Sequence, residues 1–462
     1  MRLSSLACTL ALGLASSIAH AAQPAPATPA PAAQVPGSEA IVSKTLANGL
    51  TLIVWPDHDI PNANYYTFYK VGSRNERPGI TGLAHFFEHM MFNGTTRRKP
   101  GEFDRTMEAA GGSNNASTSN DLTIYTDWFP SSALETIFDL EGDRMAHLAF
   151  DPKVVESERE VVYSERRSSV DNDNMGTLME QMQATAWLAH PYHIPTIGWP
   201  SDIERWKSDD LKAFFKTYYA PNNAVLVIAG DVEPAQVLQL ADQYLAPLPQ
   251  QAAPPAVTTV EPEQLGERRV VVERADAQSP ILAYAFHSGI GAGSPQYPAL
   301  ELLTSILAEG DSSRLHQRLV EREQLAVAAG AFAEAGFDPG LLWVYAMLPP
   351  GGDLAKVETV LDDELARIAR DGVSAAELTK ARNLQLAGFW QQMATINGKA
   401  QLLGEYAVFH GDYRKAFAAP AAFEAVTAAD VQALAKSILR KQNRTTGLVQ
   451  PVAATAHEEA TR

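Results

Sequence analysis

Two histidines four residues apart, His85 and His89, place the tightest constraint on how this chain can fold. They lie in the stretch TGLAHFFEHMMFNG, residues 81–94, with Glu88 between them. On an α-helix, residues i and i+4 share one face, so both imidazoles can turn toward a single metal ion. Two neutral imidazoles beside a carboxylate are what a catalytic zinc site takes from its first helix. The spacing predicts a helix here, and the alternative is that the histidines are simply packed in a core.

A catalytic zinc site usually has a third protein ligand. The candidates lie in SEREVVYSERR, residues 157–167, where Glu158, Glu160 and Glu165 compete. Glu158 and Glu165 are seven residues apart and therefore share a helix face, two turns from each other. A run of charges is also typical of a solvated helix surface, so spacing alone does not choose the third ligand.

The first residues of the chain have the layout of a secretory signal peptide. Arg2 is followed by an apolar run at 6–18 and by Ala19-His20-Ala21, a small-x-small cleavage site. Residues 1–21 are therefore expected to be removed on export, which predicts a periplasmic or secreted protein. We expect no membrane span, because no other apolar run approaches 18 residues.

Composition narrows the chemistry further. Cys8 is the only cysteine of the 462 residues and lies within the signal peptide. The mature protein then has no thiolate ligand or nucleophile, so a zinc ion must be held by histidine and carboxylate. The formal net charge of -17 argues against nucleic acid as the main partner, because phosphate binding requires a basic face.

Composition shifts divide the chain into regions. A chain of this length with 46% hydrophobic residues predicts two or more domains, and alternating strands and helices predict layered α/β or α+β domains. We expect an Ala/Pro-rich flexible segment at 22–38, an N-terminal zinc-binding domain at 39–246, a linker at 247–265, a C-terminal domain at 266–452 and a flexible tail at 453–462.

The pattern of the first domain restarts after the linker. A strand at 282–287 followed by a helix at 297–309 parallels the strand at 65–70 and the helix at 82–92. This indicates an internal duplication. The second copy has no His-x-x-Glu-His, so only the first half can carry this metal site.

Three stretches together carry a family resemblance: HFFEHMMFNGT, GGSNNASTSNDLTIY and ESEREVVYSE. The chain resembles the pitrilysin/insulinase family of zinc peptidases (inverzincins), in its short two-domain, processing-peptidase-like branch. The resemblance implies an α+β fold of two homologous layered domains, with mixed, largely antiparallel sheets. It also implies one Zn²⁺ per subunit held by His85, His89 and Glu165, with Glu88 as general base and Glu158 as a carboxylate supporting a ligand.

The segment GGSNNASTSNDLTIY, residues 111–125, resembles the substrate-binding edge strand of that family. Asn115 and Ala116 match the Asn-Ala of that strand. An edge strand offers unpaired N–H and C=O groups to which an extended peptide can add. The alternative is an ordinary polar turn and strand.

The second half departs from the family pattern. Many members carry an Arg and a Tyr seven residues apart that bind the substrate carbonyl, whereas this chain has Val320 and Val327 there. Arg318 and Arg322 are near but out of register. Either a homologous companion subunit supplies the pair, as in the family's heterodimers, or the chain works alone or as a homodimer with altered activity.

The resemblance thus implies an exported zinc endopeptidase acting on peptides or unfolded segments. Two alternatives remain: a non-catalytic, chaperone-like binding subunit of a peptidase complex, and a zinc hydrolase of another class. The intact set of His85, Glu88, His89 and Glu165 argues against the first, and the edge-strand segment favours peptides over small molecules.

Overall fold

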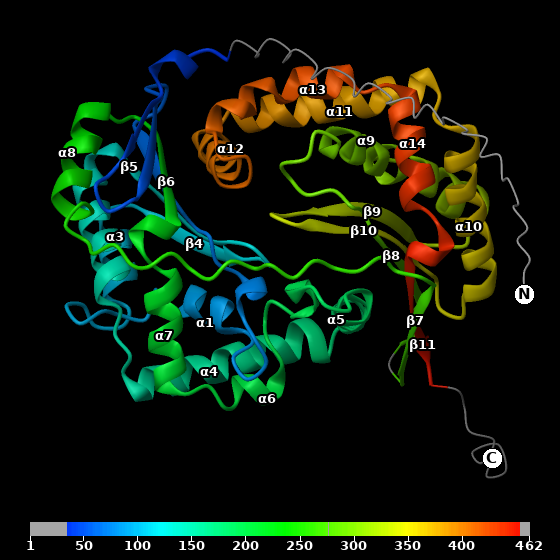
Figure 1. Ribbon diagram of the computed structural model, residues 1–462, viewed down its shortest axis with the longest axis horizontal. Helices are drawn as coiled ribbons and strands as arrows, with labels where there is room; N and C mark the ends of the chain where they lie inside the picture. Colours follow the sequence, from blue (N-terminus) through cyan, green and yellow to red (C-terminus); the bar gives the residue numbers. More distant parts are fainter. Residues whose placement is uncertain (1–34, 276, 453–462) are drawn as a thin grey trace, which may run out of the picture.

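The computed structural model describes residues 35–275 and 277–452, which form two mixed sheets with helices on both faces (Figure 1). The predicted α+β class is confirmed. The predicted signal peptide, most of the Ala/Pro-rich segment and the tail at 453–462 lie outside the described residues. In the part that is described, no helix is both long enough and apolar enough to span a bilayer.

The first sheet has the strand order β1-β2-β6-β3-β5-β4. Its neighbours are antiparallel except β2 and β6, which run parallel. The predicted hairpin at Asn48-Gly49 is confirmed, and Gly49 has the positive φ of 88° that this turn requires. The strands are β1 (Val42–Thr45), β2 (Thr51–Pro56), β3 (Asn62–Tyr69), β4 (Ser113–Thr118), β5 (Thr123–Pro130) and β6 (Ala224–Gly230).

Eight helices belong to the first half of the described chain. They are α1 (Leu83–Met90), α2 (Glu102–Ala109), α3 (Leu134–His147), α4 (Pro152–Arg166), α5 (Asn174–Ala186), α6 (Pro200–Ile203), α7 (Ser208–Tyr218) and α8 (Pro234–Tyr244). A π-helical turn, Arg167–Asp171, follows α4 directly. The main core of this half lies between one face of the sheet and helices that include α1, α3, α7 and α8.

The second sheet has the order β7-β11-β8-β10-β9, with β7 and β11 parallel and the other neighbours antiparallel. Its strands are β7 (Arg268–Arg274), β8 (Ile281–His287), β9 (Ala328–Ala335), β10 (Pro339–Met347) and β11 (Arg444–Pro451). The helices are α9 (Tyr297–Ala308), α10 (Leu354–Asp371), α11 (Ala375–Met393), α12 (Ile396–Phe409), α13 (Ala419–Ala425) and α14 (Ala428–Ile438).

The two sheets repeat one plan. The parallel pair β2–β6 corresponds to β7–β11, and the antiparallel series β6-β3-β5-β4 corresponds to β11-β8-β10-β9. Among the described residues, each series ends in an edge strand that is paired on one side only, β4 in the first sheet and β9 in the second. The internal duplication predicted from the strand–helix restart is therefore present in the fold.

One helix from each half packs against the sheet of the other half. Helix α12 covers the face of the first sheet that α1 does not, with Leu403 packed among Phe68 and Val227. Helix α5 covers the second sheet in the same way, with Met182 packed near Trp343. This exchange fixes the two halves against each other, and the long connection from α8 to β7 crosses between them (Figure 1).

Candidate metal centre

Helix α1 is fixed at its start by a buried acid. Gly82 precedes the helix with φ 85°, and a Cβ there would lie 2.5 Å from the carbonyl oxygen of Ile197. The carboxylate of Glu76 accepts hydrogen bonds from the backbone N–H of Gly82 at 2.6 Å and of Ala84 at 2.7 Å. A carboxylate at this end satisfies orphan N–H groups and suits the helix dipole. Burial nevertheless raises the pKa of Glu76 well above its ordinary value.

Two tyrosines hold the body of the same helix. The hydroxyl of Tyr125 donates to the carbonyl of Phe87 at 2.9 Å, and that of Tyr219 donates to the carbonyl of Ala84 at 3.2 Å. Both phenols are buried, so these hydrogen bonds do not compete with bulk water. The helix that carries the two histidines is thus fixed in rotation as well as at its start.

The structure brings His85, His89 and Glu165 together. The Nε2 of His85 lies 3.6 Å from one carboxylate oxygen of Glu165, and the Nε2 of His89 lies 3.3 Å from the other. One potential ligand atom from each residue lies within 4.8 Å of the others. Two imidazole nitrogens and a carboxylate form the donor set of a catalytic zinc site and leave a fourth position open.

Glu158 contacts the far side of His89. One of its oxygens lies 2.8 Å from His89 Nδ1, and the other accepts a hydrogen bond of 2.8 Å from the side chain of Asn93. A carboxylate on the second ring nitrogen leaves Nε2 free to face a metal and makes it a better ligand. Glu158 and Glu165, which sequence spacing could not separate, therefore contact different nitrogens of the same ring.

The electrostatics of the cluster follow from these contacts. Contacts with His85 and His89 lower the pKa of Glu165 far below its ordinary value, against the opposing effect of burial. Burial acts to lower the pKa of His89, but Glu158 and Glu165 outweigh it and raise the pKa to about 9. The Glu165 side chain is 42% exposed, so the cluster is accessible to water and substrate from that side.

Helix α4 brings Glu165 to this place from a well-defined start. Asp151 caps the helix by accepting from the backbone N–H of Lys153, and Pro152 occupies the first turn. At the other end the buried Arg166 pairs with Glu180 at 2.6 Å and donates to the carbonyl of Gly198 at 2.8 Å. The π-helical turn begins immediately after, a deviation that is common at functional sites.

The predicted substrate strand is β4, at the edge of the first sheet. Asn115 and Ala116 lie within it, with Asn115 exposed and Ala116 half-buried. At its end the hydroxyl of Thr118 donates a hydrogen bond of 2.5 Å to the carboxylate of Glu88. Thr118, like Glu76 and Asn93, was not identified from the sequence, although strand alternation from Ala116 points to it.

The two valines of the second half lie in different environments. Val320 packs against the second core, within a π-helical segment His316–Arg322. Val327 is 60% exposed, just before β9. Neither side chain can donate a hydrogen bond to a substrate carbonyl.

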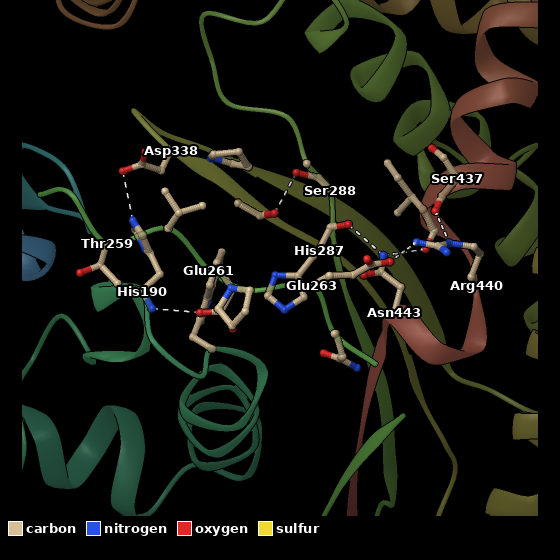
Figure 2. A pocket seen from close by; sticks show the side chains of 18 residues that line it. His190, Thr259, Glu261, Glu263, His287, Ser288, Asp338, Ser437, Arg440 and Asn443 are labelled. Carbon is tan, nitrogen blue, oxygen red and sulfur yellow. Dashed lines mark hydrogen bonds and ion pairs between the residues drawn. The ribbon is translucent and has the colours of Figure 1, made fainter. Parts of the chain in front are cut away.

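A separate cavity of about 340 Å³ lies where the linker meets the second sheet. Figure 2 shows the ring of His190 in contact with the carboxylate of Asp338 in its lining, and Glu261 accepting a hydrogen bond from the backbone N–H of His190. None of His85, His89 and Glu165 lines this cavity. It forms part of the junction between the halves and lies apart from the candidate metal centre.

Comparison with known families gives two matches. Residues 58–198 match the model described as insulinase, peptidase family M16, and residues 205–385 match the model described as peptidase M16 inactive domain. The first match contains His85, Glu88, His89 and Glu165, and the second contains most of the second sheet.

Relatives and solved structures agree with these matches. A zinc protease named PqqE from Helicobacter pylori is 32% identical over 386 residues, covering 81% of this chain and 86% of the relative. An uncharacterized zinc protease from Mycobacterium leprae is 28% identical and covers 88% of this chain and 91% of the relative. The crystal structure of a protease from Helicobacter pylori has a TM-score of 0.85 at 30% identity, covering 89% of this chain and 99% of that chain.

Proposed function

Because the chain belongs to the insulinase family of peptidases, peptidase family M16, we propose that it is an exported zinc-dependent endopeptidase. Its substrates are peptides or unfolded segments of proteins. The observation that carries the proposal is the convergence of His85, His89 and Glu165, from two helices, on one point beside Glu88. The signal peptide predicted at residues 1–21 supports export to the periplasm or beyond.

The three converging residues fit a zinc ion by donor type and by arrangement. His85 and His89 supply nitrogens, Glu165 supplies a negative oxygen, and Glu158 orients the ring of His89. A zinc ion bound there supplies Lewis-acid activation of a water molecule and of the substrate carbonyl.

Glu88 is the proton-transfer group in this proposal. Its carboxylate lies on the helix that carries both histidines and faces Thr118 of the substrate strand. As general base it takes the proton of the attacking water, and as general acid it delivers that proton to the leaving amine. This residue performs both steps because the peptide nitrogen must be protonated before it departs.

Peptide binding is assigned to the free edge of β4. An extended segment can add to this edge through main-chain hydrogen bonds alongside Asn115 and Ala116. Recognition of this kind depends on the backbone more than on side chains, so broad specificity follows. A folded domain presents few extended free segments, which restricts substrates to short or unfolded chains.

The valines at 320 and 327 support a further part of the proposal, that a homologous companion subunit completes the substrate site. A homodimer, or a single chain with reduced activity, is the alternative. The same two valines favour, as second candidate function, a non-catalytic binding subunit.

The test is peptide cleavage by the purified mature chain with measured zinc content. We expect cleavage of flexible peptides that a chelator stops and zinc restores, with about one zinc per chain. Glu88→Gln should retain zinc and lose activity by about 10²- to 10⁴-fold, the range of general-base catalysis. Full activity in that variant, or in metal-free protein, would contradict the proposal.

The companion subunit needs its own assay. The chain is tested alone and after co-expression with a homologue that carries the Arg/Tyr pair. We expect the pair of chains to cleave substantially faster than this chain alone. High activity of the isolated chain would rule out a required companion.

A further inference from the structure

The carboxylate of Glu88 has one hydrogen-bond donor among the described residues, the hydroxyl of Thr118. Thr118 Oγ1 lies 2.5 Å from Glu88 Oε2. A charge-assisted O–H···O⁻ bond of this length is at the short, strong end of its class. Because the hydroxyl engages Oε2, the other oxygen, Oε1, remains available to accept a proton from water.

Strand alternation explains how a residue of the substrate strand reaches the base. Along β4, Asn114, Ala116 and Thr118 are half-buried, whereas Ser113, Asn115 and Ser117 are exposed. Strand β4 contacts α1, and Thr118, one of these half-buried side chains, faces that helix. Thr118 thus directs its hydroxyl to Glu88 while its own backbone belongs to the sheet edge.

The end of β4 that carries Thr118 is held by contacts from both halves of the molecule. Three residues further on, Asp121 accepts hydrogen bonds from Arg74 at 2.9 Å, from the Tyr192 hydroxyl at 2.7 Å and from the backbone N–H of Phe337 at 3.0 Å. Phe337 lies at the tip of the hairpin between β9 and β10. This clamp limits movement at the end of the strand, and so keeps Thr118 in register with Glu88.

We infer that Thr118 is a positioning residue for Glu88, which holds the carboxylate of the base in a fixed orientation beside the β4 edge. The inference rests on the proposed function, since it assigns Glu88 and β4 the roles given there. The contacts of Asp121 fix the end of the strand, and the Thr118 hydroxyl fixes the carboxylate relative to that strand. Threonine suits the role because its branched Cβ restricts χ1 and so fixes the direction of the hydroxyl.

The first test separates the hydroxyl from the shape of the side chain. Thr118→Val keeps the shape and removes the donor, Thr118→Ser keeps the donor, and Thr359→Val makes the same change at an exposed position of α10 as a control. We expect kcat of Thr118→Val to fall by about 10- to 100-fold with KM within about twofold, because misplacing a catalytic group by 1 Å has an effect of this size. Thr118→Ser should stay within about threefold and Thr359→Val within about twofold of the native kcat. Equal losses in the valine and serine variants would overturn the inference.

A double variant tests whether Thr118 acts through Glu88. Thr118→Val combined with Glu88→Gln should be no slower than Glu88→Gln alone, since the hydroxyl then has no base to orient. A further loss in the double variant would mean that Thr118 acts elsewhere, for example on strand stability alone, and would overturn the inference.

A structural readout decides the question without turnover. In crystals of metal-free native protein, Glu88 should be ordered against Thr118, and in metal-free Thr118→Val it should change rotamer or become disordered. An unchanged Glu88 in the valine variant would overturn the inference. If the native chain cleaves no peptide, the proposed catalytic function fails, and these crystal structures still decide whether Thr118 orients Glu88.

Discussion

The two halves of the molecule place the same three elements together and put different chemistry on them. In the first half, α1 packs against the edge strand β4 and against α4; in the second, α9 packs against the edge strand β9 and against α11. The duplicated backbone alone therefore does not make a metal centre.

The counterpart in the second half is a cavity of about 390 Å³, lined by acids, hydroxyls and an amide together with alanines and Phe332. Ser305 donates to Glu309 at 2.5 Å, and Gln385 of α11 donates to the same carboxylate at 3.4 Å. Burial raises the pKa of Glu301 on the same helix. Ser305 and Gln385 thus satisfy the carboxylate of Glu309, whereas the first half leaves two imidazole nitrogens facing one carboxylate.

The comparison indicates that ligand type, and not the position of the helices, confines metal chemistry to the first half. Imidazole binds zinc as a neutral ligand, whereas a buried carboxylate must first lose its proton in a poorly solvated place. Substitutions that make one half resemble the other, or that remove a contact found in only one half, test this comparison.

The largest effect on zinc affinity is expected from Glu165→Gln. This change replaces the carboxylate of the first half by an amide, the group that Gln385 of α11 carries in the second half. Loss of the negative ligand should lower zinc affinity by about 100-fold or more, beyond the usual effect of a residue that only supports a ligand. Zinc titration and peptide cleavage are the measurements. The reverse change, Gln385→Glu, should leave zinc at one per chain. A second zinc in that variant would show that a carboxylate alone suffices.

A smaller effect is expected from Glu158→Gln, which weakens the contact to His89 Nδ1 at 2.8 Å. Zinc affinity should fall by about 10- to 100-fold, the usual effect of removing a carboxylate that supports a histidine ligand. Glu160→Gln, an exposed position on the same helix, is the matched control and should change affinity little. Equal affinities in the two variants would contradict the supporting role of Glu158.

Sequence reasoning predicted the part of the site that depends on local spacing. The i, i+4 relation of His85 and His89 follows from helix geometry, and the hairpin at Asn48-Gly49 follows from turn chemistry. The hydrogen bond from Thr118 to Glu88 joins residues 30 positions apart, so periodicity could only suggest it.

The sequence could not predict that α5 and α12 each pack on the sheet of the opposite half. Amphipathic periodicity shows that a helix has an apolar face, but it does not identify the surface that covers that face. Met182 and Leu403 become buried against the sheet of the opposite half, which local pattern does not specify.

The exchanged helix α12 allows a stability test of the junction. A Cβ at Gly404 would lie 2.0 Å from the ring of Phe68 on β3, whereas one at Gly388 of α11 meets no atom within 4 Å. Gly404→Ala should lower the free energy of unfolding by about 1–2 kcal/mol, because overpacking outweighs the gain in helix propensity. Gly388→Ala should raise it by up to about 1 kcal/mol. Equal shifts in denaturant midpoint would show that α12 is not closely packed on the first sheet.

The smallest expected effect is on the free energy of unfolding, and it concerns the N-terminal caps of the corresponding helices α4 and α11. Helix α4 begins with Asp151 as a single cap, whereas α11 begins with a reciprocal capping box of Ser374 and Glu377. Burial acts to raise the pKa of Glu377, but hydrogen bonds from Arg314 and Ser374 outweigh it and lower the pKa to about 2.

Because the folded pKa lies below the unfolded value, the charged Glu377 stabilises the protein above pH of about 4.5, and this contribution is lost as pH falls toward about 2. Allowing for screening at a side chain that is 32% exposed, Glu377→Gln should cost about 1 kcal/mol at pH 7 and progressively less in acid. Denaturant unfolding of both proteins at pH 7 and at about pH 3 measures the difference, with Glu424→Gln, at an exposed position of the neighbouring helix α13, as control. A cost that is independent of pH would mean that Glu377 contributes through packing and not through its charge, and the two helix starts would then differ less than their hydrogen bonds indicate.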